Sequence, residues 1–102
     1  MRLEKKRVLV VGMARSGIAA AELLLRHGAV PVLSDMKTED AFGEQLSHLH
    51  GTACEFRLGE DSVALLDETD ILMISPGVPI DAPVVKAAKE KSMPVVGELE
   101  LA

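Results

Sequence analysis

The feature that most constrains this chain is a strand-turn-helix pattern near its start. The apolar run 8–11 (V-L-V-V) is typical of a buried strand, and a glycine ends it. A helical pattern then opens at a Ser-Gly pair and covers 16–27. Such a unit directs backbone N–H groups and a helix N-terminus toward a bound phosphate. The spacing is G-x-A-x-x-G, with Ala14 in the place of the second glycine of the dinucleotide-binding fingerprint.

Segments of strand type alternate with segments of helix type along the whole chain. We expect strands over 8–11, 30–34, 53–57, 71–74 and 94–96, and helices over 16–27, 39–50, 61–66 and 83–91. Gly28 and Gly51 are expected to end the first two helices, and Pro83 to lie in the first turn of the last one. The alternation predicts one α/β domain, a doubly wound parallel sheet of about five strands in three αβα layers.

Charge and cysteine content exclude several classes of partner. The net charge is −5, and Phe42 and Phe56 are the only aromatic residues, which argues against a nucleic-acid or anionic membrane surface. Cys54 is alone, so there is no disulfide framework and no metal-binding pair of cysteines. No apolar run approaches the roughly 18 residues that span a bilayer, and no signal-peptide pattern follows Met1. We therefore expect a soluble cytoplasmic protein.

Residues suited to ligand binding follow three of the predicted strands. The first group is the glycine turn 12–17, for which packing of strand against helix is the alternative role. The second is Asp35, which follows Gly17 by 18 residues and can accept from ribose hydroxyls or a uracil imide, or cap the chain. The third is the S-P-G-V-P loop 75–79, which is either a rigid ligand-facing loop or an ordinary connector. Carboxyl ends of parallel strands share one edge of the sheet, so we expect one site there.

The usual catalytic patterns are missing from the sequence. There is no G-x-x-x-x-G-K-[ST] loop for ATP, and Ser75 has no G-x-S-x-G frame. His48 and His50 are two residues apart on a predicted helix and face different ways, so no metal site is expected. The residues predict a domain that binds a ligand and performs no chemistry by itself.

Four motifs give the chain a resemblance to a known family. They are V-L-V-V-G-M-A-R-S-G (8–17), L-S-D-M-K (33–37), I-L-M-I-S-P-G-V-P (71–79) and P-V-V-G-E-L-E-L (94–101). Together they resemble the N-terminal domain of the Mur ligases of peptidoglycan synthesis, most closely the members that add D-glutamate. The resemblance covers essentially all 102 residues. It implies that 1–97 form a Rossmann-like domain and that 98–102 begin the link to an absent ATP-binding domain.

The resemblance also implies residue roles in holding the UDP part of UDP-N-acetylmuramoyl-L-alanine. Along the diphosphate would lie Ala14, Arg15, Ser16 and Gly17. Bordering the uracil would be Asp35, Met36 and Lys37, and flanking the nucleotide from the opposite loop would be Ser75, Pro76 and Gly77. Met36 stands where some relatives carry a hydroxyl residue, so Asp35 and the backbone would have to recognise the uracil.

In the family, ATP and Mg²⁺ bind to a second domain and D-glutamate to a third. The resemblance therefore implies that these 102 residues are inactive alone and depend on the remaining domains of the same chain. Two alternatives stay open at this point. One is an NAD(P)-binding domain of a dehydrogenase or nucleotide sensor, in which Asp35 would hold the adenosine ribose. The other is an α/β module that only contacts proteins, which leaves the three glycine- or proline-bearing loops unexplained.

Overall fold

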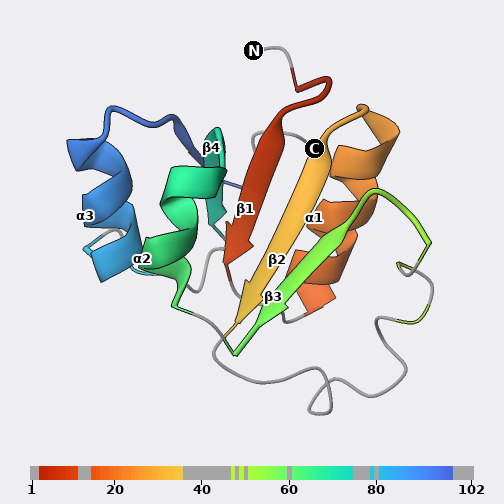
Figure 1. Ribbon diagram of the computed structural model, residues 1–102, viewed down its shortest axis with the longest axis horizontal. Coiled ribbons are helices and arrows are strands. Elements are labelled where there is room, and N and C mark those ends of the chain that lie inside the picture. The colour runs from red at the N-terminus through yellow and green to blue at the C-terminus, as the bar shows by residue number, and fades with distance from the viewer. Residues whose placement is uncertain are drawn as a thin grey trace.

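The expected strands are all present in the structure, a computed structural model that describes residues 3–11, 15–35, 47, 49, 51–59, 61–74, 79 and 81–97. The elements are β1 (Arg7–Val11), α1 (Arg15–Arg26), β2 (Val30–Asp35), β3 (Glu55–Leu58), α2 (Ser62–Leu65), the 3₁₀ helix η2 (Leu66–Glu68), β4 (Ile71–Ile74), α3 (Pro83–Glu90) and β5 (Val95–Gly97) (Figure 1). Strand ends differ from the predicted ends by no more than two residues. Residues 98–102, expected to begin a link, lie outside the described residues.

The five strands form one parallel sheet in the order β3-β2-β1-β4-β5. The chain adds β2 and β3 on one side of β1, and then returns to add β4 and β5 on the other side. The order therefore reverses between β1 and β4, which is the topological switch point of a doubly wound sheet. The predicted α/β class and parallel pairing are confirmed.

Helices cover both faces of the sheet, α1 on one and α2 with α3 on the other (Figure 1). Because successive side chains of a strand point to opposite faces, each apolar strand supplies both layers. The α1-side core consists of Leu3, Val8, Val10, Ala20, Ala21, Leu24, Ala29, Leu33, Leu49, Cys54, Ile71, Met73 and Val96. The α2/α3-side core consists of Leu9, Val32, Leu65, Leu66, Leu72, Val84, Val85 and Ala88.

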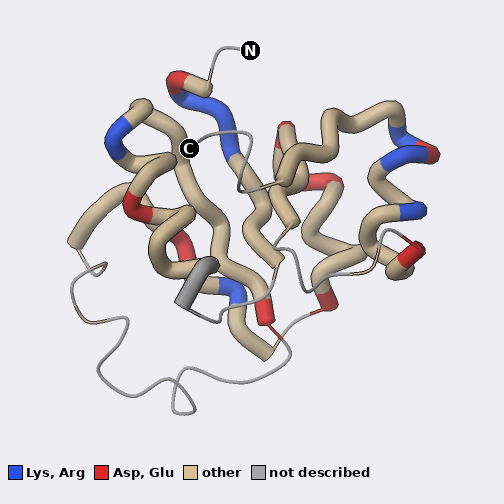
Figure 2. The backbone as a smooth tube through the Cα atoms, turned by 180° about the vertical axis from the view of Figure 1, so that it is seen from behind, with Lys and Arg blue, Asp and Glu red and all other residues tan. Residues whose placement is uncertain are grey.

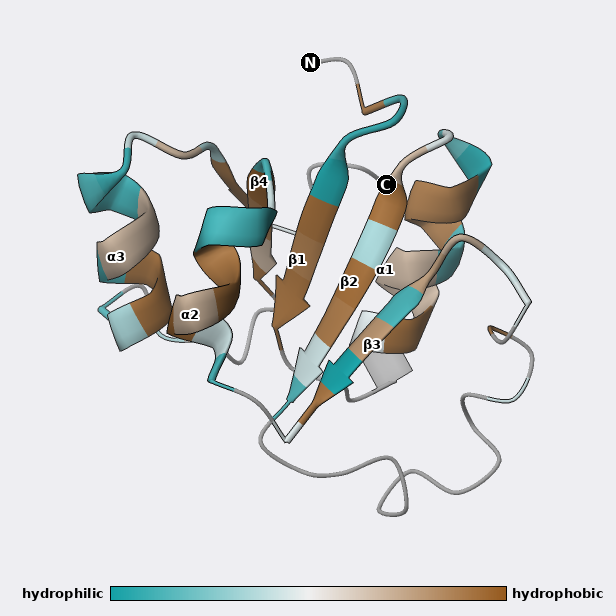
Figure 3. Cartoon of the chain, in the orientation of Figure 1, coloured by the Kyte–Doolittle hydropathy of each residue, from teal (hydrophilic) through white to brown (hydrophobic). Residues whose placement is uncertain are grey.

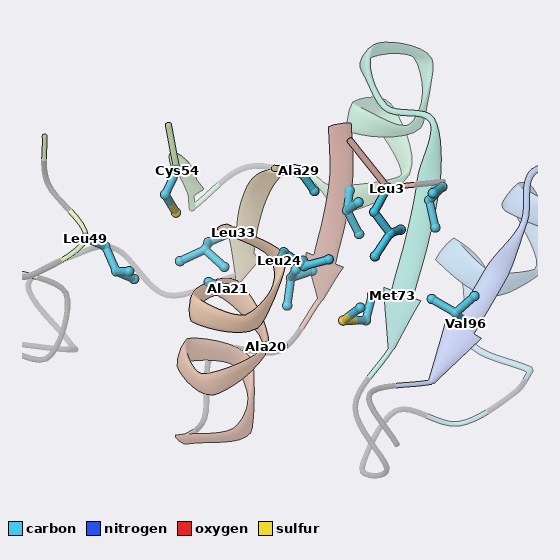
Figure 4. Close-up of a cluster of buried hydrophobic side chains, with 13 residues drawn as sticks. Leu3, Ala20, Ala21, Leu24, Ala29, Leu33, Leu49, Cys54, Met73 and Val96 are labelled. Atoms are coloured by element: carbon cyan, nitrogen blue, oxygen red, sulfur yellow. The ribbon is translucent and has the colours of Figure 1, made fainter. Parts of the chain in front are cut away.

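The side chains of α1 show how the helix is attached to the sheet. Ala21 and Leu24 are fully buried and point toward the sheet beside Leu33 of β2 (Figure 4). Hydrophobic residues continue through β1 beyond its first residue, whereas hydrophilic residues gather toward the C-terminal ends of α1 and α3 (Figure 3). The aliphatic character of both cores follows from the shortage of aromatic residues in the sequence.

The two glycines predicted to end helices adopt left-handed backbone conformations. Gly28 follows α1 with φ of +77°, and its N–H donates to the Leu25 carbonyl at 3.1 Å. A Cβ at Gly28 would also lie 3.3 Å from Cγ of Glu4, so a side chain there meets both strain and a close neighbour. Gly51 has φ of +84°. Most of the predicted helix 39–50 lies outside the described residues. Ser47 and Leu49 are the described residues of that range, and both have 3₁₀ geometry.

A turn at Thr52 explains why β3 begins later than the sequence predicts. The Thr52 hydroxyl donates to the Leu49 carbonyl at 2.5 Å and accepts from the Cys54 N–H at 3.2 Å. These bonds hold 52–54 in a turn, so the ladder with β2 begins only at Glu55. In the same way, Pro94 lacks an N–H and contributes only its carbonyl, to Leu72 N–H at 3.0 Å, before β5 begins.

The predicted helix 61–66 is shorter than expected and changes type. Asp61 caps α2, its Oδ1 accepting from the Val63 N–H at 3.0 Å. After Leu65 the chain tightens into the 3₁₀ helix η2, which ends where the Thr69 hydroxyl donates to the Leu65 carbonyl at 3.3 Å. Pro83 lies in the first turn of α3, as predicted.

Arg7 ties together three segments that are distant in sequence. Its guanidinium pairs with both carboxylate oxygens of Glu55 on β3 and donates from Nε to the Glu68 carbonyl of η2 at 2.6 Å. Arg57 of β3 pairs with Glu68 Oε1 at 3.1 Å. This ion-pair network lies on the face of the sheet opposite α1 and fastens the edge strand β3 to β1 and η2.

Replacing Arg7 by alanine is expected to lower the free energy of unfolding by about 1 kcal/mol, since a bidentate pair with side chains 33% and 35% exposed and a carbonyl bond are lost. Lys91→Ala is the matched control, because the Lys91–Asp67 pair is more exposed, at 44% and 73% of the two side chains. Its loss should cost less than ~0.5 kcal/mol. Urea unfolding of both variants checks the prediction, and equal costs for the two would contradict it.

Cys54 lies just before β3 and not inside it, although the predicted strand 53–57 contained it, and it is buried as a small hydrophobe in the α1-side core. Burial, and after it the negative charge of Glu55, raises the pKa of the thiol from an ordinary 9.0 to about 12. The thiolate is the reactive form, so a raised pKa leaves less of it at any given pH.

We therefore expect Cys54 of the native chain to react with a disulfide reagent at pH 8 at least about ten-fold more slowly than in urea-unfolded chain. Raising the pH from 8 to 9 should increase the thiolate fraction of Cys54 in both the native and the unfolded chain. The native chain should still react more slowly than the unfolded chain. The measurement is the absorbance of the released thiol, and equal rates in the two states would refute a buried, protonated thiol.

A helix needs roughly 18 or more mostly apolar residues to cross a lipid bilayer. Within the described ranges, no helix is both long enough and apolar enough to do so.

Candidate nucleotide site at the carboxyl edge of the sheet

Strand register brings the ends of β1, β2 and β4 into one row. Val11, the last residue of β1, pairs with Ser34 of β2 on one side and with Ile74, the last residue of β4, on the other. The segments that follow these three strands therefore leave from the same edge, on both sides of the switch point. This is where ligands bind in open α/β sheets. The expectation that the three strand ends share one edge is confirmed.

The described residues include only part of the predicted site. Asp35 is the last residue of β2 and is half-buried, and Gly17 is buried in the first turn of α1. Arg15 and Ser16 begin α1, although their side chains are outside the described structure. The other predicted site residues, which also lie outside it, are Ala14, Met36, Lys37, Ser75, Pro76 and Gly77.

The N-terminus of α1 follows the end of β1 at this edge. The helix begins at Arg15, one residue earlier than the sequence predicts, and residues 12–14 separate it from β1 in the sequence. The first N–H groups of a helix have no acceptor within it, and its dipole favours an anion at that end. The first turn of α1 contains no acidic residue that would compete with an anion.

Asp35 is held in place through its backbone. Its carbonyl accepts a hydrogen bond from the Gly59 N–H at 2.7 Å, and Gly59 has φ of +78°. Asp35 also pairs with Leu58, which packs against the α1-side core. Since paired residues of parallel strands point to the same face, the Asp35 side chain lies on the face that α1 covers. The carboxylate and the start of α1 are therefore on the same side of the edge.

Ser34 is a buried polar residue to which the sequence analysis assigns no role. Its exposed fraction is 1%, and it occupies the row formed with Val11 and Ile74. The only sign in the sequence that Ser34 is unusual is that it is a small polar residue in an otherwise apolar strand segment. The central strands carry charged residues only at their ends, Arg7 at the start of β1 and Asp35 at the end of β2. Most of the other coloured Lys, Arg, Asp and Glu positions lie on helices and connecting segments (Figure 2).

A protein metal site needs several ligand side chains that converge on one point. In the part of the chain that the structure describes, no group of three or more His, Cys, Asp and Glu side chains is placed to hold a metal ion.

A structural comparison supports the architecture. The crystal structure of shikimate dehydrogenase from Aquifex aeolicus matches with a TM-score of 0.62 and 16% sequence identity, over 98% of this chain and 45% of that one. At that identity the likeness concerns the fold, which is Rossmann-like.

Sequence comparisons are more specific. Residues 6–97 match the family described as Mur ligase MurD-like, N-terminal domain. Curated relatives named UDP-N-acetylmuramoylalanine–D-glutamate ligase include one from Desulfatibacillum aliphaticivorans, 36% identical over 102 residues, and one from Anaeromyxobacter dehalogenans, 42% identical over 100 residues. These matches cover 100% and 98% of this chain but only 23% and 21% of the relatives. The chain belongs to the family of MurD-like Mur ligase N-terminal domains.

Proposed function

We propose that this chain is the UDP-binding domain of an ATP-dependent ligase that adds D-glutamate to UDP-N-acetylmuramoyl-L-alanine in peptidoglycan synthesis. The observation that carries the proposal is the shared edge. The ends of β1, β2 and β4 lie in register there, with the start of α1 and Asp35 on the same side. Family membership and the names of the relatives support the choice of ligand.

Two chemical features of the edge suit a uridine diphosphate. The first-turn N–H groups of α1 are suited to the diphosphate, together with the turn at Ala14, Arg15 and Ser16. The Asp35 carboxylate is suited to accept from the uracil imide N–H, with Met36 and Lys37 beside it. In this proposal Ser75, Pro76 and Gly77, which follow β4, enclose the nucleotide from the other side of the switch point.

The chain spans about one fifth of the length of the relatives, so the reaction requires other domains. We assign ATP, Mg²⁺ and D-glutamate to those domains. In the full reaction, ATP phosphorylates the alanine carboxylate, and the amine of D-glutamate displaces the phosphate to form an amide. The residues of this chain hold and orient the nucleotide end of the substrate and are inactive alone. The substrate is a water-soluble nucleotide sugar, and we place the protein in the cytoplasm.

An NAD(P)-binding role is the second candidate, because β3-β2-β1-β4-β5 is also the strand order of dinucleotide-binding domains. Asp35 would then accept from the adenosine ribose. Ala14 disfavours this candidate, because the second glycine of the fingerprint allows the close approach of a dinucleotide pyrophosphate.

An amide-resolved NMR titration distinguishes the two candidates. The chain is titrated with UDP-N-acetylmuramoyl-L-alanine and, in parallel, with NAD. The proposal expects shifts from the UDP-sugar alone, at 12–17, 35–37 and 75–77. Shifts from NAD at the same residues would favour the dinucleotide role. The absence of shifts with both ligands would contradict nucleotide binding by this chain on its own.

A further inference from the structure

The residue that follows β3 is hydrogen-bonded to the end of β2. Gly59 comes directly after Leu58, the last residue of β3, and its N–H donates to the Asp35 carbonyl at 2.7 Å. That distance is at the short end of the usual range for a backbone N–H to carbonyl bond. Leu58 pairs with Asp35 across the ladder, so the bond extends the contact between β2 and β3 by one residue. Gly59 therefore fastens the end of β2.

Gly59 makes this bond from a left-handed backbone conformation, with φ of +78°. Only residues 59–61 separate β3 from α2 in the sequence, and α2 lies on the face of the sheet opposite α1 (Figure 1). The last of them, Asp61, already caps α2 by accepting from the Val63 N–H at 3.0 Å. A side chain at position 59 would be strained, and a β-branched one most of all.

The bond from Gly59 acts on the residue that the proposed function assigns to the nucleoside. Asp35 is the last residue of β2, and strand ends open more readily than strand centres. The Asp35 carbonyl is attached to the Asp35 Cα, so a bond that fixes this carbonyl also limits the direction in which the side chain leaves the strand. A binding group has to be held within about 0.5 Å of its productive position.

We propose that Gly59 is a positioning residue for the nucleoside end of the bound nucleotide. Its N–H holds the backbone of Asp35, and through it the carboxylate, in the orientation that accepts from the uracil imide. Gly59 makes no contact with the ligand in this arrangement. The inference rests on the proposed nucleotide-binding function and adds to it a residue that affects nucleoside recognition through Asp35 and leaves the diphosphate unaffected.

The test compares Gly59→Val with Gly51→Val, using UDP and inorganic pyrophosphate as separate probes in NMR titrations. Gly51 is the matched control, because its φ is +84°, a Cβ there would meet nothing within 4 Å, and it precedes β3 instead of following it. Both variants should lower the melting temperature by similar amounts, since each places a β-branched side chain at positive φ. Only Gly59→Val should weaken UDP binding, about five-fold, with pyrophosphate binding unchanged.

Further variants separate positioning from a merely structural role. Asparagine tolerates the left-handed region and keeps the N–H, so Gly59→Asn should bind UDP within about two-fold of wild type. In an Asp35→Ala background, Gly59→Val should cause no additional loss of UDP affinity, because the carboxylate that it positions is gone. If Gly59→Val does not fold, Gly59→Ala and Gly51→Ala make the same comparison with less strain.

Three results would overturn the positioning role while the nucleotide function stands. They are UDP binding by Gly59→Val within about two-fold of wild type, an equal loss of UDP binding in Gly51→Val, and an additional loss in the Asp35→Ala background. A parallel fall of UDP and pyrophosphate binding in Gly59→Val would make Gly59 a structural residue and would also overturn the inference. If the wild-type chain binds no UDP, the proposed function fails, and the role of Gly59 fails with it.

Discussion

Replacing Leu24 by alanine is expected to lower the free energy of unfolding by roughly 2–5 kcal/mol. Leu24 is fully buried in the α1-side core and attaches the helix to the sheet (Figure 4). Truncation removes apolar contact and leaves a cavity that close-packed neighbours fill only in part. The measurement is the urea midpoint and slope, followed by far-UV circular dichroism.

Leu23 offers a matched control on the same helix. It is only half-buried and is not part of either core, so Leu23→Ala should cost less than half as much. Similar losses for the two variants would mean that α1 is not held to the sheet through the face that contains Leu24.

Asp35→Ala is expected to weaken binding of the UDP-sugar by roughly 1–3 kcal/mol, which is about 5- to 150-fold in the dissociation constant. The reason is that the proposed uracil N–H then loses its acceptor at a half-buried position. Asp35→Asn keeps the shape and an acceptor oxygen but removes the charge, so an intermediate loss is expected. Titration calorimetry or NMR measures the affinities.

The charge itself needs a separate control, because the chain has a net charge of −5 and the proposed ligand is an anion. Asp67→Ala removes the same charge from an exposed side chain on η2, outside the carboxyl edge. Its UDP affinity should stay within about two-fold of wild type. If Asp35→Ala binds as wild type does, Asp35 is not part of the site.

The strands could be predicted because their sequence pattern is local and strong. The run 71–74 is apolar throughout, and its predicted and observed ends agree. The ends of β3 could not be predicted, because they depend on hydrogen bonds that Thr52 makes with Leu49 and Cys54. The shortening of α2 likewise depends on how η2 packs against the face of the sheet that α2 and α3 cover. Leu65 and Leu66 are both buried in the α2/α3-side core.

Of the candidate site, sequence reasoning could identify Asp35 and the start of α1, since both follow apolar strands of a recognisable unit. The structure places Asp35 at the end of β2 and Gly17 in the first turn of α1, but ligand contact by the ten proposed residues stays a prediction. The burial of Ser34 could not be predicted, because it depends on neighbours from other strands. No local pattern shows whether a serine within a strand is covered.

The sequence by itself determined the local elements, because strand and helix periodicity and the turns at Gly28 and Pro83 depend on residues a few positions apart. Only the tertiary structure decided the strand order, the face to which each side chain turns and the ion pair between Arg7 and Glu55. Those features join residues far apart in the chain, and they form only when both faces of the sheet are covered by packed helices. The meeting of β1, β2 and β4 at one edge, on which the proposed function rests, is therefore a property of the fold.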